Sequence, residues 1–81
     1  MNAPEYDEVL DASGLNCPMP LLKAKLALHQ LEPGQVLKVI ATDAGSVRDF
    51  PAYTNVSDHE LLHTFHDDER FIYWIRRGRN A

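Results

Sequence analysis

The chain has 81 residues, 44% of them hydrophobic and 25% charged, so it is long enough for one small folded domain and too short for two hydrophobic cores. Eight basic and twelve acidic side chains give a formal net charge of −4, which disfavours nonspecific binding to nucleic acid or to an anionic membrane. Its single cysteine excludes an intrachain disulfide, and a free thiol is typical of a reducing compartment.

The N-terminal residues MNAPEYDE contain neither the basic segment nor the apolar segment of a signal peptide. Apolar runs elsewhere, such as VIA, are far too short to cross a membrane. We therefore expect a cytoplasmic protein with no membrane partner. Residues 1–5 are predicted to be a flexible leader, residues 6–78 a single domain and residues 79–81 a flexible tail.

The first predicted element is a strand over residues 6–12, which the turn residues SGLN end. The segment PMPLLKAKLALHQL then predicts an amphipathic helix, because apolar residues recur along it at helical spacing. These residues are Leu21, Ala24, Leu28 and Leu31. After the breaker EPGQ, the apolar segment VLKVIAT predicts a central strand, and the strand–helix–strand order implies a right-handed crossover between two parallel strands.

A second helix is expected to open at DAGS, where Ser46 and Asp49 have the spacing of a capping box. Pro51 restricts this helix, because it must lie in the first turn unless the helix begins later than Ser46. The segment ELLHTFHDDERFIYWIRR predicts two strands joined by a tight turn at Asp67 and Asp68. The order β-α-β-α-β-β predicts a two-layer α/β sandwich, a mixed four-stranded sheet with two helices on one face.

Cys17 stands in the stretch GLNCPMP, after Gly14 and at the predicted start of the first helix. We place Pro18 at the first helical position and Pro20 at the third, where a missing N–H breaks no intrahelical bond. A helix N-terminus carries partial positive charge, so we predict a lowered pKa and a nucleophilic role for Cys17. A buried structural cysteine is the alternative interpretation, which the loop position between two prolines disfavours.

Four segments, in this order and spacing, resemble the TusA-like (SirA/YedF-type) family of small sulfur carriers. They are LDASGLNCPMPLLKAK, PGQVLKVIATD, RDFP and HELL. The family hallmark is Cys-Pro-x-Pro after a short strand, which corresponds here to Cys17, Pro18, Met19 and Pro20, and the similarity runs over about residues 10–78. The resemblance implies the same two-layer fold and a sulfurtransferase-type persulfide carrier rather than a turnover enzyme.

The resemblance also implies that Cys17 accepts sulfane sulfur as a transient persulfide, with no other cofactor and no metal. The donor would be a cysteine desulfurase or rhodanese-like protein, and a downstream protein would accept the sulfur for tRNA thiolation, molybdenum-cofactor enzymes or sulfur oxidation. Thiol exchange chemistry agrees, because no second cysteine is present to expel the sulfur. A redox sensor or a regulatory protein-interaction module using the same surface is the alternative function.

Gly14, Pro18 and Pro20 are therefore predicted to position the thiol. Met19, Arg48 and Asp49 are candidate partner contacts, although we interpret Arg48 and Asp49 first as cap and ion-pair residues. Arg48 and Asp49 fall in RDFP, where relatives have R-D-I-P.

The stretch HELLH, from His59 to His63, matches a metalloprotease zinc motif. That motif needs a helix, whereas this segment leads into a predicted strand, where positions i and i+4 lie about 13 Å apart. We therefore expect no metal site, a structural role for His59, and His63 and His66 on opposite faces of the strand. Tyr73 and Trp74 are likewise predicted to face opposite sides of the sheet, and RRGRN to be a solvated strand end rather than an RNA site.

Overall fold

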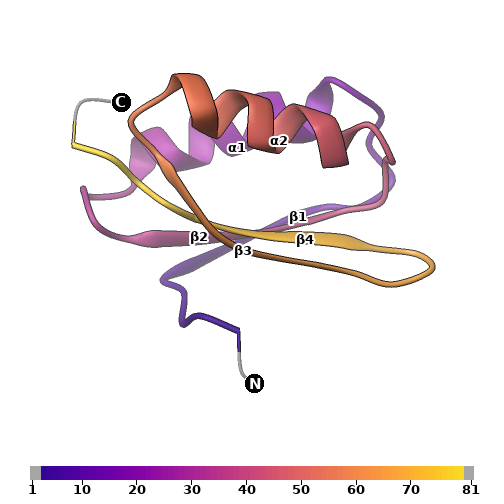
Figure 1. Ribbon diagram of the computed structural model, residues 1–81, viewed down its shortest axis with the longest axis horizontal. Coiled ribbons are helices and arrows are strands. Elements are labelled where there is room, and N and C mark those ends of the chain that lie inside the picture. Colours follow the sequence, from indigo (N-terminus) through magenta and orange to yellow (C-terminus); the bar gives the residue numbers. More distant parts are fainter. Residues whose placement is uncertain (1–2, 80–81) are drawn as a thin grey trace.

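In the computed structural model, residues 3–79 are described. The elements are β1 (Glu8–Ala12), α1 (Met19–Gln30), β2 (Val36–Ala41), α2 (Ser46–Val56), β3 (Glu60–His66) and β4 (Phe71–Arg76). Both helices lie on one face of the four-stranded sheet, and no helix of residues 3–79 covers the opposite face (Figure 1). The predicted two-layer β-α-β-α-β-β fold is therefore confirmed.

The predicted leader (1–5) and tail (79–81) lie partly outside the described residues, so their flexibility stays a prediction. The first strand begins two residues later than predicted. Its sheet pairing is nevertheless extended by Asp7, whose backbone N–H donates to the Val36 carbonyl at 2.8 Å, and whose carboxylate accepts from the Val36 N–H at 2.8 Å.

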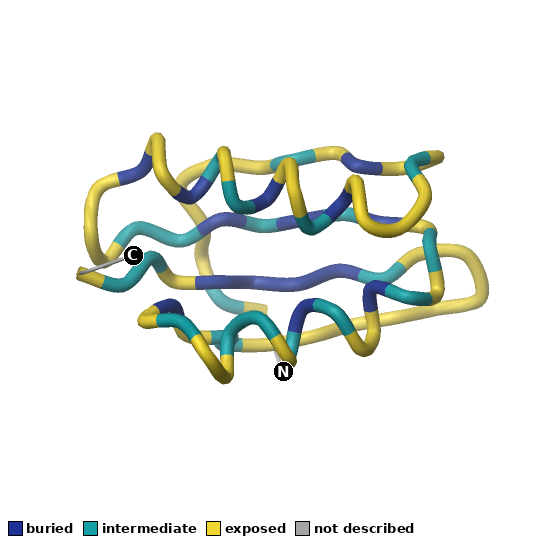
Figure 2. The backbone as a smooth tube through the Cα atoms, turned by 90° about the horizontal axis from the view of Figure 1, so that it is seen from above, coloured by how far each residue is buried: buried dark blue, intermediate teal, exposed yellow. Residues whose placement is uncertain are grey.

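The strand order is β1-β2-β4-β3. β1 and β2 are parallel, as the crossover predicts, and β4 is antiparallel to both β2 and β3. The two central strands, β2 and β4, therefore hydrogen bond on both edges. Figure 2 shows that burial is concentrated on these two strands and on the sides of the helices that face them.

The core lies between the helices and the inner face of the sheet. Phe50 of α2 is fully buried, and its ring stacks on Tyr73 of β4 with the ring centroids 4.5 Å apart. Ala24 and Leu28 of α1 are fully buried beside them, as the helical spacing predicts. Trp74 faces the open side, where the side chain of Lys38 lies over its ring, so the predicted alternation of Tyr73 and Trp74 is correct.

The start of α2 differs from the sequence prediction. The helix begins at Ser46, yet Pro51 lies beyond its first turn, inside the helix, so the two alternatives predicted for Pro51 were both wrong. The helix opens with a tight turn in which the Arg48 N–H and the Asp49 N–H both donate to the Gly45 carbonyl. Pro51 costs this helix one backbone hydrogen bond, and tertiary packing has to offset that loss.

The predicted capping box is also wrong. Gly45 occupies the cap position of α2, and no side chain caps the helix. The Ser46 hydroxyl is buried and lies 2.7 Å from the Tyr73 hydroxyl, so it bonds across to β4 instead of to its own helix.

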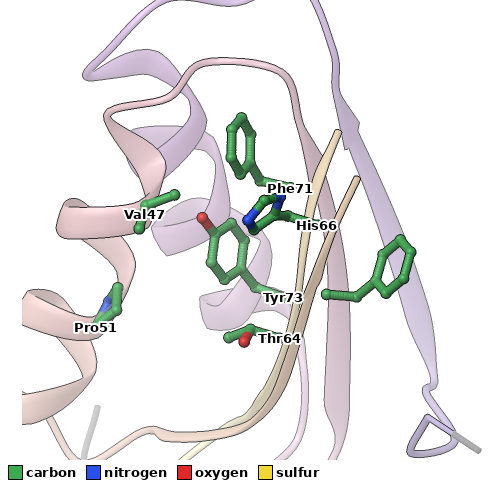
Figure 3. A pocket seen from close by; sticks show the side chains of 7 residues that line it. Val47, Pro51, Thr64, His66, Phe71 and Tyr73 are labelled. Carbon is green, nitrogen blue, oxygen red and sulfur yellow. The ribbon is translucent and has the colours of Figure 1, made fainter. Parts of the chain in front are cut away.

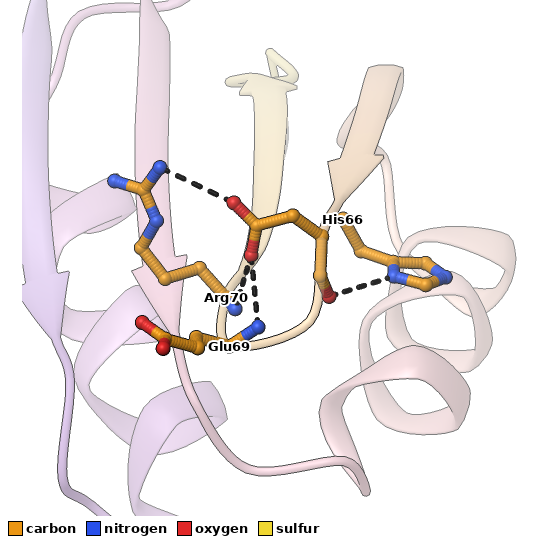
Figure 4. A network of polar contacts seen from close by, with 4 residues as sticks. His66, Glu69 and Arg70 are labelled. Atoms are coloured by element: carbon orange, nitrogen blue, oxygen red, sulfur yellow. Dashed lines mark hydrogen bonds and ion pairs between the residues drawn. The ribbon is translucent and has the colours of Figure 1, made fainter.

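The β3–β4 turn forms where the sequence places it. The Asp67 carboxylate accepts hydrogen bonds from the backbone N–H of Glu69 at 2.9 Å and of Arg70 at 2.8 Å (Figure 4). These bonds to the ionised form lower the pKa of Asp67. The hairpin end is thus closed by a single aspartate, and Arg70 forms an ion pair with the same side chain.

The histidines support the structural interpretation. His59 is buried, and its Nδ1 accepts the Gly78 N–H at 3.0 Å. His63 packs edge-on against Trp74, and His66 packs against Phe71, consistent with opposite faces of the strand. Over residues 3–79, no group of three metal-ligating side chains is close enough to hold an ion, and no helix is long and apolar enough to cross a membrane.

Candidate functional site

The Cys17 thiol lies on the loop that leaves the carboxyl end of β1 and enters α1, and it is exposed. Gly14 turns this loop with a positive φ of 81°, a conformation that glycine adopts without strain. The Gly14 N–H donates to the Thr42 hydroxyl at 2.8 Å, just beyond the end of β2. The loop is thereby fastened across the carboxyl ends of the two parallel strands, the edge of an α/β sheet where ligands and partners usually bind.

The two prolines each lie one position earlier in the helix than predicted. Pro18 is the cap residue of α1 and Pro20 is its second residue, because the helix begins at Met19. Neither proline breaks an intrahelical hydrogen bond at its observed position, since an N–H there would have no intrahelical partner. Pro20 is buried, whereas Pro18 and Met19 are exposed beside the thiol.

The structure brings Cys17 against α2. The Cys17 thiol donates a hydrogen bond to Asp49 Oδ2 at 2.9 Å, although the two residues are 32 positions apart in the chain. The other carboxylate oxygen, Asp49 Oδ1, lies 3.6 Å from Arg48 Nε. Three of the predicted site residues therefore form one cluster, in which Asp49 is mostly covered and Arg48 is largely exposed.

The predicted lowering of the Cys17 pKa is wrong for this arrangement. The hydrogen bond to the Asp49 carboxylate is the largest cause that raises the pKa of Cys17, and burial and the charges of Asp49 and Asp43 act in the same direction. Arg48 opposes them only weakly. The N-terminus of α1 also offers the sulfur fewer hydrogen-bond donors, because Pro18 and Pro20 have no N–H. The resting group is a protonated thiol.

Sequence reasoning missed Gly45 and Asp43 as site residues. A side chain at Gly45 would contact the Cys17 Sγ at 3.8 Å and would collide with Asp43 Oδ2 at 2.8 Å. Asp43 Oδ2 accepts the Gly45 N–H at 3.0 Å, which fixes the turn before α2. Their sequence signal is the stretch DAGS, which follows a parallel strand and so comes to the same edge of the sheet as Cys17.

A shallow groove of about 160 Å³ lies between α2 and the β3–β4 hairpin (Figure 3). Its lining residues are Val47, Pro51, Thr64, Phe65, His66, Phe71 and Tyr73. Val47 and Asp49 are two residues apart on α2, about 200° around the helix axis. The groove therefore lies on the side of α2 away from the thiol, and Cys17 does not line it. Chemistry at Cys17 takes place on an open surface.

Fold and site together define a small α/β domain that presents one thiol at the carboxyl edge of a parallel strand pair. The chain belongs to the TusA family: the family model described as "Sulfurtransferase TusA" matches residues 8–77.

Named relatives agree with this assignment. The chain is 47% identical over 74 residues to "Sulfur carrier protein TusA" of Allochromatium vinosum, covering 91% of this chain and 97% of that protein. It is 43% identical over 72 residues to "Putative sulfur carrier protein YrkI" of Bacillus subtilis, covering 89% and 96%. The crystal structure of a SirA-like protein from Desulfitobacterium hafniense superposes with a TM-score of 0.65 at 29% identity, over 90% of this chain and 100% of that one.

Proposed function

We propose that the protein is a cytoplasmic sulfur carrier that holds sulfane sulfur as a persulfide on Cys17 and passes it from one protein to another. The observation that carries the proposal is the exposed thiol at the end of the Gly14 turn, with no second cysteine anywhere in the sequence. Relatives over nearly the full length of the chain are named sulfur carriers. The proposed role requires no cofactor other than this transient persulfide.

The transfer step is thiol exchange. The Cys17 sulfur attacks the outer sulfur of a donor persulfide, a new S–S bond forms on Cys17, and the donor's own S–S bond breaks. The donor's inner sulfur leaves with the electron pair as a thiolate, and the Cys17 proton must be taken up by a base. No net oxidation occurs. In delivery, the acceptor thiol attacks the outer sulfur of the Cys17 persulfide, the Cys17 S–S bond breaks, and the Cys17 sulfur leaves with the electron pair as a thiolate.

The donor in this proposal is a cysteine desulfurase or a rhodanese-like protein, and the acceptor is a protein of tRNA thiolation, molybdenum-cofactor or other sulfur metabolism. The surface beside the thiol supports a protein partner, because three apolar side chains of α1 are exposed there in a helical row. They are Met19 at 41%, Leu22 at 44% and Leu26 at 67% exposure. Exposed apolar rows of this kind mark protein contact surfaces.

The test is to incubate the protein with a cysteine desulfurase and free cysteine and to measure its intact mass. We expect the gain of one sulfur atom, about 32 Da. Treatment with a reductant should remove the gain, and the Cys17→Ala variant should never show it. A wild-type protein that gains no sulfur, or a gain that persists in Cys17→Ala, would exclude the proposed function.

The alternative functions make different predictions. A redox sensor would oxidise Cys17 to a sulfenic acid. The raised pKa of Cys17 does not separate it from a sulfur carrier, because both chemistries require the thiol to lose its proton. A regulatory interaction module that does not use the thiol would bind its partner equally well after Cys17→Ser. Under the sulfur-carrier proposal, that variant loses all sulfur delivery.

A further inference from the structure

Asp49 Oδ2 lies 2.9 Å from the Cys17 sulfur and accepts its proton in a hydrogen bond. We propose that Asp49 is a catalytic residue of sulfur transfer, the base that receives the thiol proton as Cys17 attacks the outer sulfur of the donor persulfide. The inference rests on the proposed function and adds to it a chemical role for a residue that sequence reasoning interpreted as a cap, ion-pair or partner-contact residue.

The position of Asp49 is fixed from both sides. Its backbone N–H donates to the Gly45 carbonyl at 3.0 Å within the first turn of α2. The following residue, Phe50, is fully buried and stacked on Tyr73, and Ser46 of the same turn bonds to Tyr73 at 2.7 Å. The backbone of Asp49 therefore cannot move away from the thiol without loosening the core.

The two carboxylate oxygens of Asp49 have separate partners. Oδ1 faces Arg48 Nε at 3.6 Å, and Oδ2 faces the thiol. The nearby carboxylate of Asp43 is already engaged, because its Oδ2 accepts the Gly45 N–H at 3.0 Å. Asp49 is thus the carboxylate with an oxygen placed to receive the thiol proton.

The chemistry needs such a base because the resting sulfur is protonated. Sγ of Cys17 becomes the inner sulfur of the new persulfide, bonded to carbon and sulfur, and cannot keep its proton. As the new S–S bond forms, the S–H proton becomes strongly acidic, so a carboxylate within hydrogen-bond distance can take it at that moment. The donor S–S bond breaks in the same step, and Asp49 then holds the proton as a neutral carboxyl that can pass it to the departing thiolate or to water.

The experiment compares wild-type protein with Asp49→Asn in two reactions at the same neutral pH. The first is alkylation of Cys17 by iodoacetamide, which follows the thiolate fraction. The second is loading of Cys17 by glutathione persulfide, followed by intact mass. We expect Asp49→Asn to alkylate several-fold faster, because the carboxylate that holds the proton on sulfur is gone, and to load about a hundredfold more slowly, the lower end of the range for a general base.

These opposite changes distinguish a base from other roles. If Asp49 acted only through its charge, both rates would rise, and if it acted only through the fold, both would fall. Either result, or two unchanged rates, would overturn the proposal. Glu32→Gln removes the same charge from the turn between α1 and β2, at the opposite edge of the sheet, and should change neither rate, whereas Asp49→Glu should recover part of the loading.

The pH profile gives a second readout that a purely structural role would not change. Loading of the wild-type protein should be nearly independent of pH around neutrality, because the thiol proton passes to Asp49 within the transfer step and the thiol need not ionise beforehand. Loading of Asp49→Asn should rise with pH, about tenfold per unit, because it depends on the free thiolate.

Glutathione persulfide needs no docking surface, so this test is separate from that of the proposed function. Failure of a cysteine desulfurase to load wild-type protein would contradict the carrier role and leave the Asp49 result standing. An Asp49→Asn variant that loads as fast as wild type would contradict the base role alone.

Discussion

A buried hydrogen bond between the Ser46 and Tyr73 hydroxyls joins α2 to β4, three residues before the carboxylate that holds the thiol. Burial raises the pKa of Tyr73, so its hydroxyl is neutral and available as a donor or an acceptor at any physiological pH. At the scale of single residues, this bond is what fixes the first turn of a helix that has no side-chain cap.

Tyr73→Phe tests this bond. The variant keeps the ring that stacks on Phe50 and leaves the Ser46 hydroxyl buried without its partner, so we expect a loss of about 1–3 kcal/mol in the free energy of unfolding. Urea denaturation measures it, with the exposed Tyr6→Phe as the control, expected within about 0.5 kcal/mol of wild type.

Ser46→Ala combined with Tyr73→Phe should cost less than the sum of the single changes, because both remove the same bond. Additive losses would show that the two hydroxyls do not depend on each other.

At the scale of elements, α1 has two apolar sides with different roles. Ala24 and Leu28 are fully buried against the sheet, whereas Met19, Leu22 and Leu26 are exposed along the outer side. Leu22 and Leu26 also lie at helical spacing from buried positions, so the sequence pattern alone does not separate them from the core residues. Their exposure agrees with the docking surface that we propose beside the thiol.

Leu26→Ser tests this outer surface. Because Leu26 is 67% exposed, we expect a change in the free energy of unfolding within about 0.5 kcal/mol. Loading by glutathione persulfide should be unchanged, whereas loading by a cysteine desulfurase should need several-fold more donor protein to reach half its maximal rate.

Val9→Ser is the matched control. Val9 is similarly apolar and 51% exposed, but it alternates with Leu10 of the core and so faces the open side of the sheet. If both variants weakened the response to the desulfurase equally, the outer side of α1 would not be the docking surface.

At the scale of the whole molecule, the C-terminal segment closes the fold through His59 and Arg77. The Gly78 N–H donates to His59 Nδ1, and the Arg77 guanidinium donates to the Leu28 carbonyl at the end of α1 at 2.8 Å. Burial lowers the pKa of His59, and the charge of Arg77 adds to the effect. The folded protein therefore holds His59 neutral.

The lowered pKa of His59 makes the free energy of unfolding depend on pH. Below about pH 6.5 the unfolded chain takes up a proton on His59 that the folded chain resists, so the free energy of unfolding falls as the pH is lowered, until His59 of the folded protein is also protonated. His59→Asn keeps an acceptor for the Gly78 N–H and removes the titration. Thermal unfolding between pH 7.5 and pH 5 should therefore show a shallower decline for this variant.

His66→Gln, at an exposed site at the other end of β3, should retain the wild-type slope. A wild-type slope in His59→Asn as well would show that other groups cause the decline.

The sequence by itself determined the order of the elements, the opposite orientations of Tyr73 and Trp74, and the place of Cys17 before a helix that opens with two prolines. These follow from short-range rules: side chains alternate along a strand, recur every 3.6 residues in a helix, and proline lacks an N–H. The same rules also identified the Asp67 turn and rejected HELLH as a zinc site.

Only the tertiary structure decided the strand order, the position of Pro51 inside α2 and the chemical state of the thiol. The thiolate prediction rests on the partial positive charge of the α1 N-terminus, which comes from residues next to Cys17 in the sequence. The carboxylate that keeps Cys17 protonated instead belongs to a residue 32 positions away. That contact exists because the crossover between the parallel strands β1 and β2 brings the starts of both helices to one edge of the sheet. A contact between two residues so far apart in the chain cannot be predicted from a local sequence pattern.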